Sequence, residues 1–430
     1  MIIKLGEDGM RKVTKFDIVT WCIFLLLSSG INAQNVPYKM RAACLQSCNT
    51  CDFLTATLDA IESVLEQPAR SLACAATPIS QFDFNDLSLT YTITQPGTYC
   101  LTETVAGAIY IDSSDVTLDL NGFSMISAAP SVICNQGCNG LIGYHLCTLG
   151  GCGSCGSYTN NITIKNGSVS GINIACCNGV QLLDINSSSS ITLYSSSYVA
   201  VSNIVVVNPT AAYYCDGEPI GCLFYNCQYV QVVDSIFNSG GYGLFINGGS
   251  NFVLNRCTCN NNSSGFIFVS VSNIVVSHCL ACNNGYFGFC ANVNCGGFTV
   301  SNFLFDSCIA MNTSNETGQD GIGFYFTEGG SAYGVINNCN AVGNSGIGFM
   351  VQGDNITVSN CQSTGTPANN SLFVGCFGAP LVSAGFYGSS PSTHFYNNAA
   401  CNNGINYQNV NEPQLQLGNP NFAVGFNLSN

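Results

Sequence analysis

The loop PTAAYYCDGEPIGC, residues 209–222, gathers the side chains of this 430-residue chain that are best suited to chemistry. It brings Tyr213 and Tyr214 close to two carboxylates, Asp216 and Glu218. Paired carboxylates can bind Ca²⁺ or act as acid and base, and tyrosine rings suit a sugar. The alternative is a solvated turn, because Asp-Gly is a common turn pair. The loop is our candidate for ligand binding, with Ca²⁺ as the one cation it could hold and no metal site expected elsewhere.

Charge narrows the classes of partner. The chain has 9 Lys and Arg against 23 Asp and Glu, which gives a net charge of −14. Nucleic acid phosphates demand Lys and Arg, so this balance argues against nucleic acid and against an anionic membrane surface. It suits cations or neutral sugars instead. A second acidic loop, residues 312–321, adds Glu316 and Asp320 to the candidates.

The 27 cysteines fall into two groups. Members of the first group follow a strand-like run and precede an Asn-rich turn: Cys257, Cys279, Cys308, Cys339 and Cys361. Equal positions in stacked strands lie about 4.8 Å apart. We expect an inward column of small apolar side chains, because free cysteine is among the most buried residue types. We expect the column to remain thiols, since in-register strands misplace Cβ atoms for a disulfide and a straight stack cannot surround a metal.

The second group is irregular and lies in loop-like sequence. The group contains Cys100 and Cys147 and the disulfide candidates Cys44, Cys48, Cys51, Cys74, Cys134, Cys138, Cys152 and Cys155. In a secreted chain this spacing indicates disulfide staples. Two C-x-x-C pairs, Cys48/Cys51 and Cys152/Cys155, leave zinc as the alternative.

An internal repeat predicts the elements that position these residues. Copies begin at Gly243, Gly265, Gly288, Gly321 and Gly348, first 22 and 23 residues apart and then 33 and 27. Each copy contains a run such as FVLNRC, IVVSHC, FLFDSC or ITVSNC, with apolar residues at about every second position between Gly, Asn and Ser. The pattern predicts strands and tight turns that stack on neighbouring copies, with insertions between them.

The earlier chain has the same texture, as in NITIKNGSVSG and YVAVSNIVVVN. Its entry, YTITQPGTYCLTE followed by IYIDSSDVTLDLNGFSM, resembles the opening of right-handed parallel β-helix repeat proteins, the pectin-lyase-like superfold. The resemblance spans roughly residues 83–410. It implies an all-β chain with a single right-handed parallel β-helix. It implies no particular function, because this fold hosts lyases, hydrolases, tailspikes, adhesins and spacers.

The catalytic patterns that the resemblance would supply are missing. Hydrolases of the superfold carry an Asn-x-Asp, an adjacent Asp pair, a Gly-His and an Arg-x-Lys, and its lyases need an Arg or Lys base. The chain has no Asp-Asp, its three histidines follow Tyr, Ser and Thr, and only Lys165 and Arg256 are cations inside the expected solenoid. Arg256 falls in a varied polar register, which predicts an outward, solvated turn. We expect Asp119, in DLNG, to shape a turn through its side-chain oxygen.

The N-terminal residues 1–33 have the layout of a secretory signal peptide. A basic cluster just after Met10 precedes the apolar run 18–27 and a small-residue exit that ends at Ala33. Met10 is a candidate for the true start. The alternative is an uncleaved anchor, but the run is shorter than the ~20 residues that a spanning helix needs. After cleavage we expect no transmembrane helix.

Residues 34–82 form a Cys-containing segment before the solenoid. Within it, Leu54, Leu58, Ile61 and Leu65 follow helical spacing, which predicts an amphipathic helix. We expect this helix to cap the open end of the solenoid, because an uncovered end is an unpaired strand edge. The alternative is a partner-binding helix. The polar tail, residues 411–430, is expected to lie over the last rung.

The chain also carries sequons that predict surface turns if the host glycosylates: Asn161, Asn166, Asn186, Asn261, Asn262, Asn312, Asn315, Asn355, Asn369 and Asn427. The sequence thus predicts a secreted or surface-exposed β-helix without catalysis, acting as a structural, adhesin-like or glycan-contacting module. Its partner would be a polysaccharide or a cell-surface structure. The alternative is a divergent carbohydrate-active enzyme, a lyase or glycoside hydrolase that uses loop carboxylates.

Overall fold

The computed structural model of the chain describes residues 76–408, except for gaps at 86, 128–129, 136–157, 208, 210–217, 239, 292–299, 315–320, 327–330, 366–372, 375–379, 382–383, 389, 391, 402 and 404. The described residues belong to one compact unit, Cys74–Asn430. The predicted signal peptide, capping helix and C-terminal tail lie outside them, so those predictions stay predictions. None of the helices in the described part of the chain could cross a bilayer.

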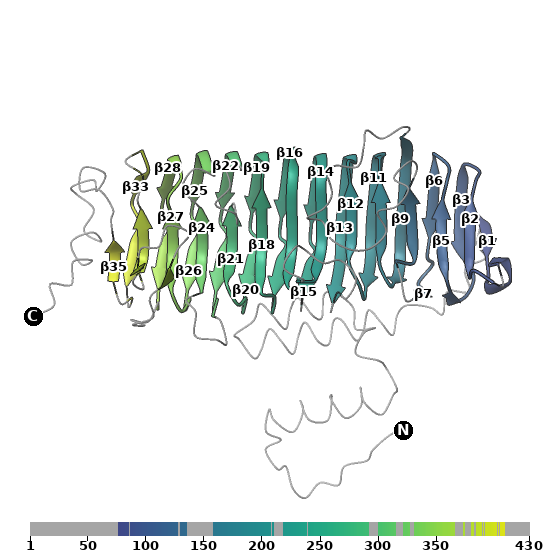
Figure 1. The fold of residues 1–430 in the computed structure, drawn as a ribbon, viewed down its shortest axis with the longest axis horizontal. Helices are drawn as coiled ribbons and strands as arrows, with labels where there is room; N and C mark the ends of the chain where they lie inside the picture. Colours follow the sequence, from purple (N-terminus) through teal and green to yellow (C-terminus); the bar gives the residue numbers. More distant parts are fainter. Residues whose placement is uncertain are drawn as a thin grey trace, which may run out of the picture. The chain divides into compact units, whose positions relative to one another are not determined.

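The described strands form a parallel β-helix, which confirms the predicted all-β solenoid (Figure 1). They pair in parallel in three series, here called sheets A, B and C. A rung visits the three sheets in that order and then returns to sheet A one strand spacing further along. From Tyr242 to its partner Ser264 this circuit takes 22 residues, the period read from the repeat.

Sheet A runs from one end of the described region to the other. Its strands are β2 (Thr90–Ile93), β5 (Ala108–Ile111), β8 (Val132–Asn135), β10 (Ile172–Ala175), β12 (Ile191–Tyr194), the first halves of β14 (Ile220–Val233) and β16 (Tyr242–Asn255), β18 (Ser264–Val269), β21 (Phe287–Ala291), β24 (Ile322–Phe326), β27 (Ile347–Val351), β32 (Ala384–Gly388) and β35 (Ile405–Gln408).

Sheet B follows sheet A along each rung. Its strands are β1 (Thr77–Ile79), β3 (Gly97–Leu101), β6 (Val116–Asp119), the first parts of β9 (Thr159–Val169), β11 (Cys177–Ser187) and β13 (Ser197–Val207), the second halves of β14 and β16, β19 (Ser272–Ser277), β22 (Val300–Asp306), β25 (Ser331–Asn337), β28 (Asp354–Ser359) and β33 (His394–Tyr396).

Sheet C closes the rung with short strands. It comprises β4 (Val105–Ala106), β7 (Ser124–Ile126), the ends of β9, β11 and β13, β15 (Ile236–Asn238), β17 (Thr258–Asn260), β20 (Leu280–Cys282), β23 (Ile309–Met311), β26 (Asn340–Val342), β29 (Gln362–Thr364) and β34 (Ala399–Cys401). Outside the solenoid pairing, β30 (Phe373–Val374) and β31 (Pro380–Leu381) form an antiparallel pair, and a 3-10 helix, η2, spans Gln81–Asp83.

The core is filled by inward side chains that repeat from rung to rung. In sheet A a stack of phenylalanines contains Phe266, Phe289, Phe324, Phe349 and Phe386, all fully buried. Neighbouring rings are nearly parallel, with centroids 4.7–4.8 Å apart. Because this separation equals the spacing of parallel strands, backbone pairing and ring stacking favour the same register.

The outward side of sheet A is apolar as well. Leu223, Phe245, Ile267, Tyr325 and Met350 belong to a second hydrophobic cluster, separate from the core and at most 5% exposed. Strands buried on both faces read as continuous apolar runs, and GFIFV in β18 is one. Sheet A is therefore closed to solvent on both sides over these rungs.

Candidate functional site

The acidic loop that the sequence favours is mostly outside the described residues. Tyr213, Tyr214 and Asp216 fall in its gap, and so do Glu316 and Asp320 in theirs. The binding role predicted for both loops therefore stays a prediction.

Glu218 is the described member of the acidic loop. Its Oε2 accepts a hydrogen bond from Ser263 Oγ at 3.1 Å, and its side chain lies against Gly241, where an added Cβ would clash with it. Glu218 is thus tied to the neighbouring rung.

The two cations of the solenoid are both in ion pairs. Lys165 Nζ lies 3.3 Å from Asp119 Oδ2. Arg256 makes a two-pronged pair with Asp234, with Nε and Nη2 at 2.7 and 2.8 Å from its two oxygens. The predicted exposure of Arg256 is confirmed, with 56% of its side chain accessible, but its partner went unforeseen. A lyase base must be free to accept a proton from the substrate, and both cations are held by carboxylates. Neither cation therefore suits that role.

The described carboxylates serve corners of the solenoid. Asp119 Oδ1 accepts the backbone N–H of Asn121 at 2.8 Å, which confirms its predicted role in a turn. Asp306 accepts amide hydrogens from Asn337 and Asn338, one rung away, at 2.9 and 3.2 Å. The described residues contain no cluster of His, Cys, Asp or Glu that could hold a metal ion.

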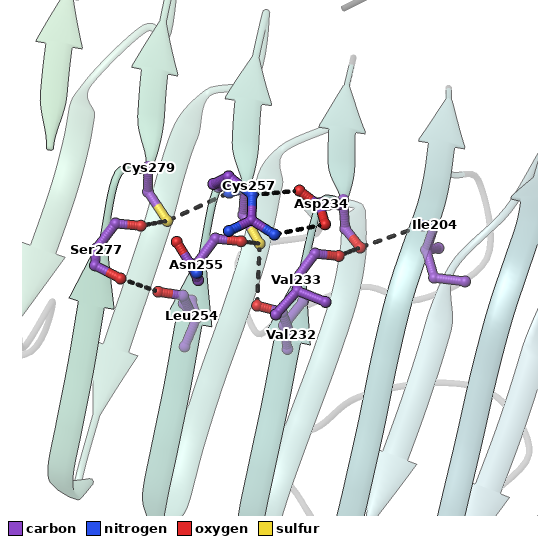
Figure 2. A network of polar contacts seen from close by, with 11 residues as sticks. Ile204, Val232, Val233, Asp234, Leu254, Asn255, Cys257, Ser277 and Cys279 are labelled. Carbon is purple, nitrogen blue, oxygen red and sulfur yellow. Dashed lines mark hydrogen bonds and ion pairs between the residues drawn. The ribbon is translucent and has the colours of Figure 1, made fainter. Parts of the chain in front are cut away.

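The five repeated cysteines occupy one corner, between sheets B and C, and all are buried and free. Figure 2 shows Cys257 and Cys279 turned toward the carbonyls of Asn255 and Ser277, two residues earlier. The same contact recurs in every member of the column, with Sγ–O distances of 3.2–3.6 Å. Each of these carbonyls also accepts a backbone N–H from the preceding rung, so the thiol is a second donor to it.

The same column continues with polar residues, so an apolar side chain is not required in it. Ser235 precedes Cys257 in the column and donates to Val233 O at 2.8 Å, while Asn398 follows Cys361 and accepts from its backbone N–H. Each column residue follows one with positive φ, such as His278 at 54°. The site thus selects a small side chain that hydrogen-bonds the corner, rather than an apolar one.

Burial keeps three thiols of this column protonated. Desolvation raises the pKa of the Cys279, Cys308 and Cys361 thiols well above the usual value. A protonated thiol can donate to a carbonyl and is a poor nucleophile, so these three thiols are suited to structure and not to reaction. Cys339 differs: burial raises the pKa of its thiol, but hydrogen bonds with Cys308 and Cys361 outweigh burial and lower it to about 5.

Among the irregular cysteines, Cys134 lies within the described residues, buried and free, with Sγ 3.1 Å from Cys177 Sγ. If Cys134 is oxidised as predicted, Cys177 is its nearest partner. Cys100 and Cys176 each take part in a disulfide. The other disulfide candidates lie outside the described residues: Cys44, Cys48, Cys51, Cys74, Cys138, Cys152 and Cys155.

One predicted glycosylation site is wrong. Asn262 is only 5% exposed, and its Nδ2 donates to Phe237 O at 3.0 Å inside a corner between sheets C and A. A glycan there would break this hydrogen bond. The exposed sequon residues are Asn161, Asn186, Asn261, Asn312 and Asn355, with Asn166 half-buried.

Sheet B presents an open surface, and a column of residues with positive φ lies near the start of its strands. Strand register aligns Tyr198, Tyr229, Asn251, Asn273, Asn302, Tyr333 and Asn355 in this B-edge column. Asn and Gly tolerate the left-handed backbone region, whereas it strains a bulky ring. Three tyrosines occupy it here and are 50–64% exposed. Strain kept at exposed aromatic residues points to a role other than stability.

Part of this column lines a shallow, open depression of about 500 Å³ across β19, β22, β25 and β28, here called the groove. Its outward floor is an aliphatic stripe that is open to solvent, with Val275, Leu304 and Val335 each 36–39% exposed. Its edge is polar, with the side chains of Asn273, Asn302, Tyr333 and Asn355. Asn302 Nδ2 donates to Asn273 Oδ1 at 3.3 Å, and Asn273 Nδ2 donates to Asn251 Oδ1 at 3.2 Å. The groove thus combines apolar, aromatic and amide groups without a cation.

Sequence reasoning overlooked this groove although a signal was present. Counting back six residues from each cysteine of the repeat reaches Asn251, Asn273, Asn302, Tyr333 and Asn355. Tyr333 is the one tyrosine among four asparagines at this position of the repeat.

Comparison with known proteins agrees with this architecture. Residues 220–400 match the family described as right handed beta helix region. The match and the parallel pairing of the described strands agree that this chain has the β-helix fold. No curated protein matches its sequence.

Solved structures similar to this β-helix protein share little sequence with it. PfbA, a surface adhesin of Streptococcus pneumoniae, is 12% identical, with 82% of this chain and 87% of that chain covered and a TM-score of 0.37. The A-module of a mannuronan C-5 epimerase from Azotobacter vinelandii is 10% identical, covering 73% and 89%, with a TM-score of 0.41. An alginate lyase from Paenibacillus sp. is 10% identical, covering 77% and 98%, with a TM-score of 0.36.

Proposed function

We propose that this β-helix protein is a non-catalytic glycan-contacting module that acts outside the cell or at its surface. The observation that carries the proposal is Tyr333, a 64% exposed ring held at a positive φ beside the groove of sheet B. The signal-like segment 1–33 supports the extracellular setting.

The groove has the chemistry that a sugar requires. One face of a sugar ring is lined by C–H groups, which pack on an aromatic ring or on aliphatic side chains such as Leu304. Its hydroxyls need donors and acceptors, and an asparagine amide offers both. Asn273, Asn302 and Asn355 supply amides along one edge of the groove. A few convergent polar groups around apolar surface are typical of ligand sites.

We expect no catalysis because the described charged groups discussed above are held in ion pairs or hydrogen bonds. Lys165 and Arg256 are paired with carboxylates, and Asp119 and Asp306 hold corners. We expect the purified protein to release no reducing or unsaturated ends from pectin or polygalacturonate. Release that is lost in Asp216→Asn or Glu218→Gln variants would instead establish the enzyme reading.

A glycan microarray tests the binding function. The wild type should bind at least one neutral glycan, and Tyr333→Asn should lose most of the signal. Asparagine already occupies this register in neighbouring rungs, so Tyr333→Asn should fold. Tyr158→Asn is the matched control, because Tyr158 is 51% exposed and is not among the residues that line the groove. Absence of binding to every glycan, or equal binding by Tyr333→Asn, would refute the proposal.

A further inference from the structure

The B-edge column carries a second aromatic feature beyond the groove. Tyr198 and Tyr229 lie on neighbouring rungs, and their rings stack with centroids 4.9 Å apart and planes 7° apart. Both rings are at least half exposed, at 61% and 50%, and both residues have φ near 54°. The strained tyrosine at Tyr333 is therefore repeated twice in the same column.

Three asparagine rungs separate this tyrosine pair from Tyr333. The register runs from Tyr229 through Asn251, Asn273 and Asn302 to Tyr333. Four strand spacings of about 4.8 Å place the Cα atoms of the two tyrosines roughly 19 Å apart. The amides between them are chained, because Asn302 and Asn273 each donate through Nδ2 to the Oδ1 of the asparagine on the preceding rung. From Tyr198 to Tyr333 the column thus has an aromatic group at each end and amides in the middle.

An exposed aliphatic stripe follows the same rungs. Val253, Val275, Leu304 and Val335 are 36–40% exposed and occupy the outward position of consecutive B strands. Beside the stripe, the carboxylate of Asp306 accepts amide hydrogens, and the one arginine nearby, Arg256, is paired with Asp234. A polyanion would find no uncommitted cation among these described residues, and the net charge of −14 would repel it.

We infer that sheet B binds a linear, uncharged polysaccharide that lies parallel to the solenoid axis and contacts both tyrosine platforms at once. This inference rests on the glycan-binding function proposed above and specifies its ligand. Two linked contacts on one chain raise affinity without further contacts at either, provided that the ligand spans the distance between them. Fragments too short to reach from Tyr229 to Tyr333 therefore bind more weakly than long chains.

Affinity electrophoresis tests the inference with the full chain. Native gels contain cellulose derivatives, mannan, xylan or galactan as neutral probes, and polygalacturonate or alginate as anionic probes. We expect retardation by at least one neutral polysaccharide and by neither anionic one. Tyr229→Asn and Tyr333→Asn should each weaken binding about tenfold, equivalent to ~1.4 kcal/mol, and the double variant more. Tyr158→Asn serves as the control.

The outcomes separate the two proposals. If Tyr333→Asn loses binding while Tyr198→Asn and Tyr229→Asn bind like the wild type, the axial track is wrong and the glycan function stands. Equal affinity for oligomers and polymer of the bound glycan would likewise reject the track. Preferential retardation by polygalacturonate or alginate would reject the uncharged ligand. Absence of retardation by all probes, together with an empty microarray, would reject both proposals.

Discussion

The outward sides of sheets A and B belong to the same rungs, yet one is closed and the other is open. Phe245 and Ile267 on sheet A are at most 1% exposed, whereas Val275 and Leu304 on sheet B are 37% and 36% exposed. The burial of the two strands differs accordingly, since every residue of GFIFV in sheet A is buried, whereas the apolar run IVV of β19 in sheet B alternates between buried and exposed. The outward side of sheet A thus behaves as a second buried face, whereas the outward side of sheet B is available to a ligand.

The largest effect should come from truncating the closed side. Phe245→Ala removes a buried ring although its side chain points away from the core, and should lower the free energy of unfolding by about 3–5 kcal/mol. Leu304→Ala, on the open side, should cost at most about 1 kcal/mol. Denaturant titration of both variants measures the contrast. Equal costs would mean that the outward side of sheet A does not behave as a second core.

The corner between sheets B and C should show a graded response. Cys279→Asp places an unpaired charge in the core and should cost several kcal/mol, on the order of 3 or more. Cys279→Ala loses a small group and a hydrogen bond and should cost about 1 kcal/mol. Cys279→Ser keeps the donor, as Ser235 does, and should be the mildest. If alanine proves milder than serine in thermal unfolding, hydrogen bonding is not what selects this column.

A substitution on the open side of sheet B should raise stability and lower glycan binding. Tyr333→Asn relieves a ring from a positive φ of 57° and lets the new amide extend the chain from Asn302. We expect it to raise the free energy of unfolding by up to about 1 kcal/mol while glycan binding falls. Thermal unfolding of this variant against the Tyr158→Asn control measures the gain. A clear loss of stability would show that Tyr333 is a packing residue.

The smallest effect should be the reactivity of the cysteine column. Since burial raises the pKa of the Cys279 and Cys308 thiols, they stay protonated at pH 8 and should resist iodoacetamide in the native protein. After denaturation without reductant, mass spectrometry should find the column fully alkylated. Labelling that requires a reductant would identify the column as a disulfide ladder instead.

Much of the fold was predictable because the repeat is nearly regular. Period-2 runs and a cysteine at a constant position fix which side of each B strand faces the core, as Val276 and Cys279 show. The candidate site was less predictable. The carboxylates and tyrosines of the loop 209–222 favoured Asp216 and Glu218 as site residues. Tyr333 lies beside the groove at the start of a repeat strand, where the sequence shows no other reactive or charged residue.

The sequence by itself determined the rung, its length of about 22 residues and the inward corner cysteine, since alternation and turn residues act over a few neighbours. Only the tertiary structure decided that Tyr198, Tyr229 and Tyr333 share one column. Counting back from the repeated cysteines reaches Tyr333, but Tyr198 and Tyr229 precede no cysteine of the repeat, so only backbone pairing aligns them with it. It also decided that sheet A is closed and sheet B open, because the outward residues Phe245 and Val275 are both apolar and their sequence does not tell how far each is buried.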